Sequence, residues 1–598
     1  MNKVTNNYFS VFRGFALSLA ISSLALVGLN AVSAQAYAAN GSNENKIAKR
    51  INGGGMPLSQ LKYDLTIASF DGTEIAITIY QPELKQGQPA PLLMFSHGWG
   101  GSRSTDLSET DSLTETSRKA WDSGYFVITF DQRGFGDSGG QANSQDPDIE
   151  GRDIQTLLDW AEYNLTPHLA YFKGDPLVGG IGLSYGGGFQ LVGSSVDPRF
   201  DALVPAMTWH DLPYSLSPES VPKTLWLSVL SALARESQAP FLTQAYAESL
   251  TGTASEETSK RLGRNGLGAY CKPRTDGLGI PKVDALFIQG VNDTLFNINE
   301  ATWNYECLRS AGNDAYLFVT TGGHILPAFQ DGSDGGTLDF GGFFNDIQCG
   351  DTSYTLADLS YTFLNGKLRK LKRTIPIPRV CLTQDRSQGV ISDEVPKGGT
   401  VLHFASGNLL VGAPSVDVVL NLFRKLDNTA QADALSRLSA DTASLLTQAL
   451  IGLITIDQDR VTALLTELVE TQTPALLAEL GTAPRFVPLH TASIDQILAG
   501  IPLADLIIEG ENTLDPRVFV GLGIKRLGQS SPALLHDQIL PMRGTGARQT
   551  ELIGVSTQLR SGDQVGLMLY GFHPQYALGF SRITSAVNLT GKVQLPLQ

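Results

Sequence analysis

Between residues 60 and 380, short apolar runs alternate with longer segments in which apolar residues recur every three or four positions. Short runs are typical of buried strands, and amphipathic segments such as Glu150 to Tyr163 predict helices. This alternation builds a mostly parallel sheet covered by helices, an α/β fold. The candidate strands are Ile75–Tyr80, Pro91–Phe95, Tyr125–Phe130, Val178–Leu183, Ala202–Ala206, Ala285–Gln289 and Ala315–Thr320.

Residues 207–275 interrupt this rhythm with segments that have a helical pattern, from Leu225 to Leu233 and around Phe241. Insertions between late strands of such sheets commonly cover the ligand crevice at the carboxyl ends of the strands. We therefore predict a helical cap over the site, with helices that only add bulk as the alternative.

The pattern changes after Cys381. Residues 382–412 and 486–598 are rich in Gly, Val, Leu and Thr with frequent turn signals, which favours an antiparallel sandwich. Between them, residues 415–483 predict a helical hairpin that serves packing. One predicted helix carries an apolar face of Val461, Leu464, Leu465, Leu468 and Val469, and its partner carries Leu435, Leu438, Leu445 and Leu446.

The first residues resemble a secretory signal peptide. Lys3 and Arg13 precede an apolar run, residues 14–31, and small residues such as Ala34 and Ala36 follow it. We predict cleavage of residues 1–36, export to the periplasm or the extracellular space, and no stable membrane span afterwards. An uncleaved N-terminal membrane anchor is the alternative, since the apolar run nearly reaches spanning length.

Length and charge restrict the remaining possibilities. A chain of 598 residues exceeds one hydrophobic core, so we expect a catalytic domain at 37–380 and a C-terminal domain at 381–598. The net charge of -15 disfavours a nucleic-acid partner. The oligomeric state is left open.

Four cysteines fall in one stretch without a pair at metal-binding spacing. In an oxidising compartment they predict two disulfides, for which three connectivities are open, and free buried thiols are the alternative. The four candidates are Cys271, Cys307, Cys349 and Cys381.

The strongest local motif is Gly182-Leu183-Ser184-Tyr185-Gly186, between the apolar run from Val178 and a helical segment. A strand that turns sharply into a helix needs small residues beside the turn, because larger side chains would collide there. The central hydroxyl is then presented above the sheet. Ser184 is therefore our candidate nucleophile.

A serine nucleophile needs a base, and the base needs an orienting carboxylate. His324 follows the last predicted strand and Asp293 follows the one before it, which gives the chain order Ser, Asp, His of α/β-hydrolases. Asp314 is a weaker candidate for the acid, because it precedes its strand.

Oxyanion stabilisation requires donors that are already in place. We expect the backbone N–H of Tyr185 and that of Trp99, in the turn His97-Gly98-Trp99 after an early strand, to fill this role. His97 itself is expected to shape that turn. The charged residues of the loop Asp131–Gly139 are expected to be structural ties.

Trp209 and His210 are tentative substrate-binding residues, together with His97; a loop contact is an equal alternative for His210. The other histidines have no partner suggested by the sequence. No metal-protease, phosphate-binding or dinucleotide motif occurs. No cofactor is therefore expected.

Two separate stretches resemble the Xaa-Pro dipeptidyl-peptidase and cocaine-esterase group of α/β-hydrolases. In the catalytic part the matching motifs are Asp131-x-Arg133-Gly134-x-Gly136-x-Ser138-x-Gly140, Asp159-Trp160 and the motif around Ser184. In the C-terminal part, which resembles the family's jelly-roll domain, they are Glu551–Thr557, Ser561–Asp563, Leu567–Gly571 and Gly591–Val593.

The resemblance implies a triad of Ser184, Asp293 and His324, and hydrolysis of a peptide bond after proline or of an ester. Two features depart from the family pattern. Known members use a tyrosine hydroxyl as the second oxyanion donor, where this chain has His97-Gly98-Trp99, and the insertion 415–483 is additional.

Three functions remain open on these grounds. The first is an exported serine hydrolase with Xaa-Pro dipeptidyl-peptidase-like action on small peptides or esters. The second is a carboxylic ester hydrolase without peptidase activity, which needs no acidic group to hold a substrate amine. The third is a catalytically inert binding protein.

Overall fold

The computed structural model describes residues 55–412 and 484–598, except 110, 274, 276, 277, 327–339, 341, 373, 386, 387, 511 and 512. Within 413–483 it describes residues 420, 423, 428–450, 460, 463, 464 and 467. Gly53–Gln598 form one compact unit. The predicted signal peptide lies outside the described residues.

The centre of the catalytic domain is a ten-stranded sheet of order β1-β2-β4-β3-β7-β8-β9-β10-β13-β14. Strands β4, β3 and β7 to β10 run parallel, and β1, β2 and β14 are antiparallel to their neighbours. Every strand predicted from the sequence is present. The strands are β1 (Leu61–Ala68), β2 (Glu74–Gln81), β3 (Leu92–Ser96), β4 (Phe126–Phe130), β7 (Val178–Leu183), β8 (Phe200–Ala206), β9 (Asp284–Gly290), β10 (Ala315–Thr320), β13 (Val380–Asp385) and β14 (Gln388–Ser392).

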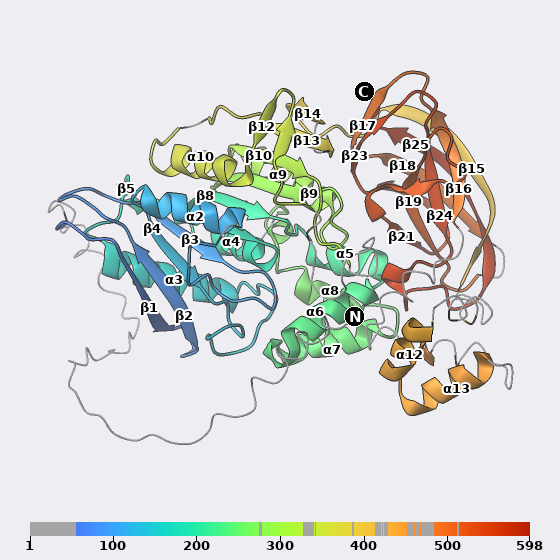
Figure 1. The fold of residues 1–598 in the computed structure, drawn as a ribbon, viewed down its shortest axis with the longest axis horizontal. Helices are drawn as coiled ribbons and strands as arrows, with labels where there is room; N and C mark the ends of the chain where they lie inside the picture. The colour runs from blue at the N-terminus through green and yellow to red at the C-terminus, as the bar shows by residue number, and fades with distance from the viewer. Residues whose placement is uncertain are drawn as a thin grey trace, which may run out of the picture. The chain divides into compact units, whose positions relative to one another are not determined.

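Helices cover both faces of this sheet, which explains the continuous apolar runs of its strands (Figure 1). In β3, Leu92 and Met94 belong to the apolar core on the face that helices α3 (Glu150–Leu165), α4 (Tyr185–Val196) and α9 (Ile298–Ser310) cover. Leu93 and Phe95 point to the other face, against α2 (Ser112–Asp122) and α10 (Leu356–Leu368). Side chains that alternate along a strand thus serve two cores.

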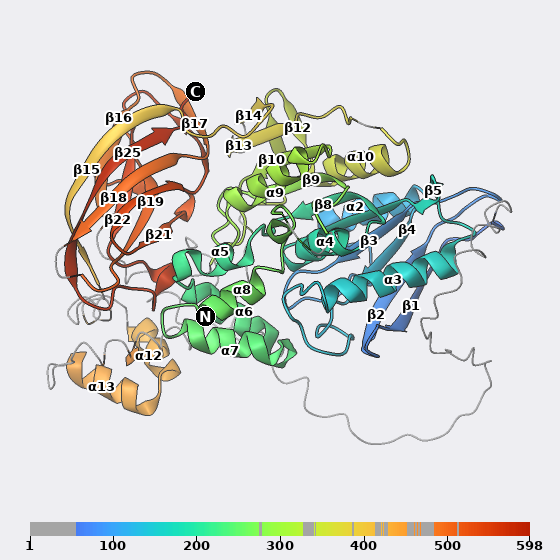
Figure 2. The same ribbon diagram turned by 180° about the vertical axis from the view of Figure 1, so that it is seen from behind.

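The cap predicted at 207–275 is helical, as expected. It leaves the sheet after β8 and returns at β9, and Figure 2 shows its helices together beside the carboxyl end of the sheet. Its α-helices are α5 (Leu212–Leu216), α6 (Thr224–Ala234), α7 (Pro240–Ser249) and α8 (Glu256–Leu262).

The catalytic sheet extends further along the chain than residue 381, where the sequence pattern places the domain boundary. Strand β13 pairs in parallel with β10, and β14 folds back onto β13. The change in the sequence pattern at Cys381 therefore marks an antiparallel hairpin that forms the last two strands of the sheet. The ten-stranded sheet thus ends with Ser392.

The C-terminal domain is an antiparallel sandwich, as predicted. One sheet has the order β15-β25-β18-β22, the other β16-β24-β19-β20 with β21 beside β19, and β17 pairs with β23. Its strands are β15 (Thr400–Val411), β16 (Arg485–Thr491), β17 (Gln496–Gly500), β18 (Leu503–Gly510), β19 (Arg517–Lys525), β20 (Ala533–Leu534), β21 (Leu540–Arg543), β22 (Gly546–Glu551), β23 (Val555–Leu559), β24 (Gln564–Tyr570) and β25 (Ser585–Leu595).

The described part of the insertion 415–483 is helical, with α12 (Asn428–Arg437) and α13 (Ala440–Leu450). The predicted single helix through Leu435 and Leu446 is therefore two helices, separated by residues 438 and 439. Most of the predicted helix at 461–469 lies outside the described residues.

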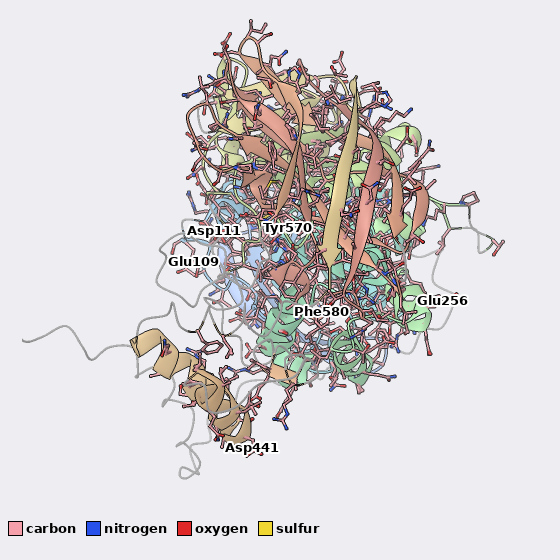
Figure 3. All side chains as sticks on the ribbon, turned by 90° about the vertical axis from the view of Figure 1, so that its right-hand side faces the viewer. Glu109, Asp111, Glu256, Asp441, Tyr570 and Phe580 are labelled. Atoms are coloured by element: carbon pink, nitrogen blue, oxygen red, sulfur yellow. A yellow bond between two sulfur atoms is a disulfide. The ribbon has the colours of Figure 1, made fainter. Side chains whose placement is uncertain are left out.

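The C-terminal domain packs directly on the cap. Tyr570, at the end of β24, shares an apolar cluster with Val221 of the cap, and Phe580 shares another with Trp226 of α6. Figure 3 labels both residues, Tyr570 among the strands of the sandwich and Phe580 near their lower ends. Burial of such large side chains contributes about 1.5–3 kcal/mol each.

The cysteines form two disulfides. Cys271, in the last part of the cap, bonds to Cys307 of α9, and Cys349 bonds to Cys381 of β13. None of the helices in the described ranges is long and apolar enough to cross a membrane.

Candidate active site

Ser184 occupies the sharp turn between β7 and α4. Its backbone has φ 56° and ψ -118°, a conformation that costs energy for any residue with a side chain. Two glycines make the turn possible. A Cβ on Gly186 would lie 2.2 Å from the carbonyl oxygen of Ser96, and one on Gly182 would lie 2.5 Å from that of Gly186. This is the strand–turn–helix geometry of a nucleophile elbow.

Asp293 and His324 follow the neighbouring parallel strands β9 and β10, at the same edge of the sheet as Ser184. Both side chains are buried, and His324 Nδ1 donates to Asp293 Oδ2 over 2.6 Å. A carboxylate oxygen can only accept, so a neutral His324 carries its proton on Nδ1. Nε2 is then the nitrogen that can accept a proton.

The second oxygen of the Asp293 carboxylate is also bound. Oδ1 accepts from the backbone N–H groups of Leu295 at 3.0 Å and Phe296 at 2.7 Å. The carboxylate is thus held in its plane by three donors. A carboxylate fixed in this way orients an imidazole and stabilises the imidazolium ion.

The turn His97–Gly98–Trp99 lies beside the nucleophile. A Cβ on Gly98 would lie 3.7 Å from the Cβ of Ser184. The Trp99 indole Nε1 donates to the carbonyl of Leu230 in α6, 2.9 Å away, which ties this turn to the cap. The N–H of Tyr185 begins α4, where a helix leaves its first N–H groups without internal partners.

Aromatic rings surround the side chain that follows the nucleophile. The ring of Tyr185 contacts Trp99 at 4.9 Å, Phe135 at 5.9 Å and Trp209 at 6.4 Å between centroids. Trp209 comes this close because position 188 is glycine; a Cβ there would lie 2.4 Å from the Trp209 ring. Trp209 therefore packs beside the Tyr185 ring, and its role in substrate binding stays a prediction.

His97 is held inside the protein at both ring nitrogens. Nδ1 donates to the carbonyl of Gly98 at 2.7 Å, and Nε2 accepts from the N–H of Gln132 at 3.1 Å. Burial lowers the pKa of this imidazole, which favours the neutral ring that these bonds require. His97 thus shapes its turn.

His210 is tied to α9. Its backbone N–H donates to Glu300 Oε2 at 2.6 Å, and its Nδ1 is 3.0 Å from Asn304 Oδ1. Because Glu300 also accepts from the N–H of Asp211 at 2.9 Å, this buried carboxyl anchors the start of the cap. These contacts favour an architectural role for His210 over substrate binding.

Asp314, the alternative candidate for the acid, lies at the amino ends of the parallel strands, on the side of the sheet opposite to Asp293 and His324. It precedes β10, and its carboxylate pairs with Lys367 at 2.6 Å and with Arg379. The loop Asp131–Gly139 likewise uses its charges internally. Asp131 accepts from the N–H of Asp137 at 2.8 Å and pairs with Arg103.

Several groups near Asp293 have no signal in the sequence. Lys223 of the cap is buried and donates to the carbonyls of Thr294 at 2.8 Å and Leu295 at 3.0 Å. Burial lowers its pKa to about 8, against the opposing effect of the Asp293 charge. His536, which the sequence left without a partner, is bonded to Asn292 at 2.8 Å.

No cluster of three or more His, Cys, Asp or Glu side chains suited to a metal occurs among the residues that the structure describes. The groups at the site are a hydroxyl, an imidazole, a carboxylate and backbone amides. This set can perform acid–base and nucleophilic chemistry on a carbonyl carbon.

Comparison with solved structures gives the same fold over nearly the whole chain. An α-amino acid ester hydrolase aligns with a TM-score of 0.54 and 14% identity, covering 90% of this chain and 96% of its own. An aminopeptidase from a marine sediment Thaumarchaeota archaeon gives 0.55 and 14%, covering 96% and 100%. A CocE/NonD family hydrolase from Staphylococcus aureus gives 0.52 and 12%, covering 90% and 94%.

A curated relative matches by sequence over a shorter region. It is an uncharacterized 31.7 kDa protein in the traX-finO intergenic region of Escherichia coli, 30% identical over 140 residues. The match covers 23% of this chain and 43% of the relative, less than half its length.

The family comparison addresses the catalytic domain. Residues 71–326 match the model of the X-Pro dipeptidyl-peptidase (S15) family, and this range contains Ser184, Asp293 and His324. The solved structures above share both the α/β-hydrolase fold and the β-rich C-terminal part. The resemblance predicted from the sequence is therefore confirmed: the family match covers residues 71–326, and the fold match covers nearly the whole chain.

Proposed function

We propose that this protein is a serine hydrolase that forms an acyl-enzyme on Ser184, with His324 as base and Asp293 as orienting acid. One observation carries the proposal. The buried 2.6 Å bond from His324 Nδ1 to Asp293 Oδ2 lies at the sheet edge where Ser184 sits in a strained turn. Strain of this kind is retained only where the surrounding structure enforces it.

In the proposed reaction, Ser184 Oγ bonds to the substrate carbonyl carbon while its proton passes to His324 Nε2. The N–H groups of Tyr185 and Trp99 donate to the resulting oxyanion. His324 then returns the proton to the leaving alcohol or amine as the tetrahedral intermediate collapses to the acyl-enzyme. A water molecule then attacks the acyl-enzyme in the same two steps, with His324 taking its proton. The carboxylic acid leaves, and Ser184 regains its hydroxyl proton.

We propose Xaa-Pro dipeptidyl-peptidase-like hydrolysis of small peptides or esters as the activity. Support comes from the S15 match, and from the aminopeptidase and ester hydrolase of the same fold. Hydrolysis of carboxylic esters alone is the second candidate. It is favoured by the turn His97-Gly98-Trp99, which stands where known members of the family have a tyrosine.

We further propose that the protein acts outside the cytoplasm after loss of residues 1–36. Two disulfides support this, since such bonds persist in oxidising compartments. N-terminal sequencing of the protein recovered from the periplasm or medium is expected to begin at Tyr37. Recovery of the intact N-terminus in membranes would favour the anchor instead.

A direct assay separates the candidates. The protein is incubated with an Xaa-Pro arylamide and with a short-chain aryl ester, and Ser184→Ala serves as the matched control. Turnover of both substrates, lost in the variant, supports the peptidase-like activity. Ester turnover alone would eliminate it, and turnover of neither by folded protein would favour an inert binding protein.

A further inference from the structure

The loop Val291–Phe296, which carries Asp293 and is here named the acid loop, has its backbone carbonyls bound by side-chain amides and an ammonium group. Gln538 Nε2 donates to Val291 O at 3.1 Å and Asp293 O at 2.9 Å. Gln575 Nε2 donates to Thr294 O at 2.8 Å, the carbonyl that Lys223 also contacts.

Two of these donors belong to the C-terminal domain, more than 240 positions away in the sequence. Gln538 and Gln575 are both buried, so their amides could not be satisfied by water. A buried carbonyl that loses its donor costs about 1–3 kcal/mol. The position of the acid loop thus depends on another domain.

The segment that delivers Gln538 is itself unusual. His536 and Asp537 have φ of 56° and 53°, two consecutive left-handed residues with side chains. The turn brings His536 Nδ1 to 2.8 Å from Asn292 Oδ1, next to the acid. Burial lowers the pKa of His536 to about 4, so the imidazole is neutral in this contact. Strain kept beside the acid loop indicates that the contact is maintained at an energetic cost.

The C-terminal domain also contacts the catalytic domain at a place that does not include the acid loop. Glu551 pairs with Lys397 at 2.9 Å and accepts from the indole of Trp303 at 2.8 Å. Trp303 belongs to α9 and lies outside the acid loop. This contact joins the two domains without touching the residues that carry the proposed chemistry. It therefore provides a matched control.

We infer that the C-terminal sandwich is part of the catalytic apparatus, with Gln538 as the principal positioning residue and Gln575 and His536 in support. This inference rests on the proposed function. Gln538 fixes the backbone on both sides of Asn292, and hence the direction in which Asp293 presents Oδ2 to His324. Without it, the folded enzyme would retain Ser184 and its substrate contacts but lose orientation of the imidazole.

The test measures a rate for each active site. Gln538→Met keeps the length of the side chain and removes both donors, and Glu551→Gln is the control. A fluorophosphonate probe reports the amount of reactive Ser184 at completion and the rate constant of labelling, and aryl ester turnover reports kcat and KM. Misplacement of a catalytic group by about 1 Å costs roughly 100-fold.

For Gln538→Met we expect the labelling rate constant and kcat to fall roughly 10- to 100-fold at an unchanged KM and an unchanged labelled amount. For Glu551→Gln we expect both rates to stay near those of the natural protein. A smaller labelled amount with unchanged rates would overturn the inference, because it would show a purely structural role for Gln538.

If Gln538→Met does not fold, the shorter Gln538→Asn decides the question by the same two readouts. It loses reach to at least one carbonyl and is expected to show the same fall in rate at constant KM. Absence of labelling at Ser184 in the natural protein would instead contradict the proposed function. Equal labelling rate constants in all folded variants would contradict only this inference.

Discussion

At the scale of single residues, the proposed chemistry depends on which atoms of Asp293 accept hydrogen bonds. Oδ1 is occupied by two backbone N–H groups, so Oδ2 is the atom that faces His324. The backbone therefore selects which oxygen orients the imidazole. An asparagine at position 293 would keep the Oδ1 contacts, but its amide nitrogen would donate to His324 where the carboxylate oxygen now accepts.

Asp293→Asn is expected to lower kcat for an aryl ester by about 10⁴-fold. The new Nδ2–H₂ group would donate to Nδ1 of His324 and shift the imidazole proton to Nε2, where it blocks proton acceptance from Ser184. Asp314→Asn is the control, because it breaks the ion pairs with Lys367 and Arg379 at the opposite edge. That control should lose stability and keep its rate per active site; the reverse result would make Asp314 the acid.

Glu300 gives a prediction about pH. Burial raises the pKa of this carboxyl to about 8 from its ordinary 4.5, so the folded protein keeps a proton that the unfolded chain releases between these values. Stability from Glu300 is therefore complete below about pH 4.5 and is lost as pH rises toward 8, at up to about 1.4 kcal/mol per unit.

Glu300→Gln keeps the shape of the neutral acid and cannot ionise. Between pH 5 and pH 8, the Tm of the natural protein should fall more than that of the variant. Calorimetry at the two pH values measures this difference. Parallel curves would mean that Glu300 is ionised in the folded protein at both pH values.

The residues of the proposed triad could be predicted because each depends on local order along the chain. A glycine-flanked serine follows one strand, and an acid and a histidine follow two later ones. Lys223, His536 and Gln538 could not be predicted, since their partners lie 70 or more positions away and neither lysine nor glutamine carries a motif.

At the scale of elements, the cap is attached by covalent and polar links to α9. Cys271, near the end of the cap, bonds to Cys307 of α9, while Glu300 of the same helix accepts from the backbone N–H groups of His210 and Asp211 near its start. One helix of the catalytic domain thus holds both ends of the insertion. The cap should therefore keep its position over the site only while α9 remains linked to it.

Replacing both Cys271 and Cys307 by serine is expected to destabilise the protein by about 4 kcal/mol or less, from the closure of a loop of 36 residues. Chemical denaturation measures the loss. The Cys349→Ser and Cys381→Ser pair, which closes 32 residues outside the cap, is the matched comparison. We expect similar losses of stability, with reduced ester turnover only for the cap pair.

The sequence pattern predicted the elements of the catalytic domain well wherever strands are buried on both faces. It missed β1, whose side chains are largely exposed and whose apolar pattern is weak. It also assigned β13 and β14 to the following domain, because an antiparallel hairpin at the edge of a sheet has the same sequence pattern as the strands of a sandwich. In both cases the sheet to which a strand belongs depends on the strand it pairs with, and the sequence pattern does not reveal that pairing.

At the scale of the whole chain, the described unit combines a catalytic sheet, a cap and a sandwich that share contacts around one loop. Lys223 contacts the acid loop from the cap, and Gln538 and Gln575 do so from the sandwich. Fold comparison over nearly the full chain agrees with this three-part architecture. We therefore expect the parts to act as one enzyme.

The central claim is that Ser184 is the activated nucleophile. Labelling of the folded natural protein with a fluorophosphonate, followed by peptide mass spectrometry, tests it most directly. We predict a single phosphonylated site at Ser184, abolished in Ser184→Ala and slowed strongly in Asp293→Asn. Folded protein that stays unlabelled, or that carries the label on another residue, would contradict the account.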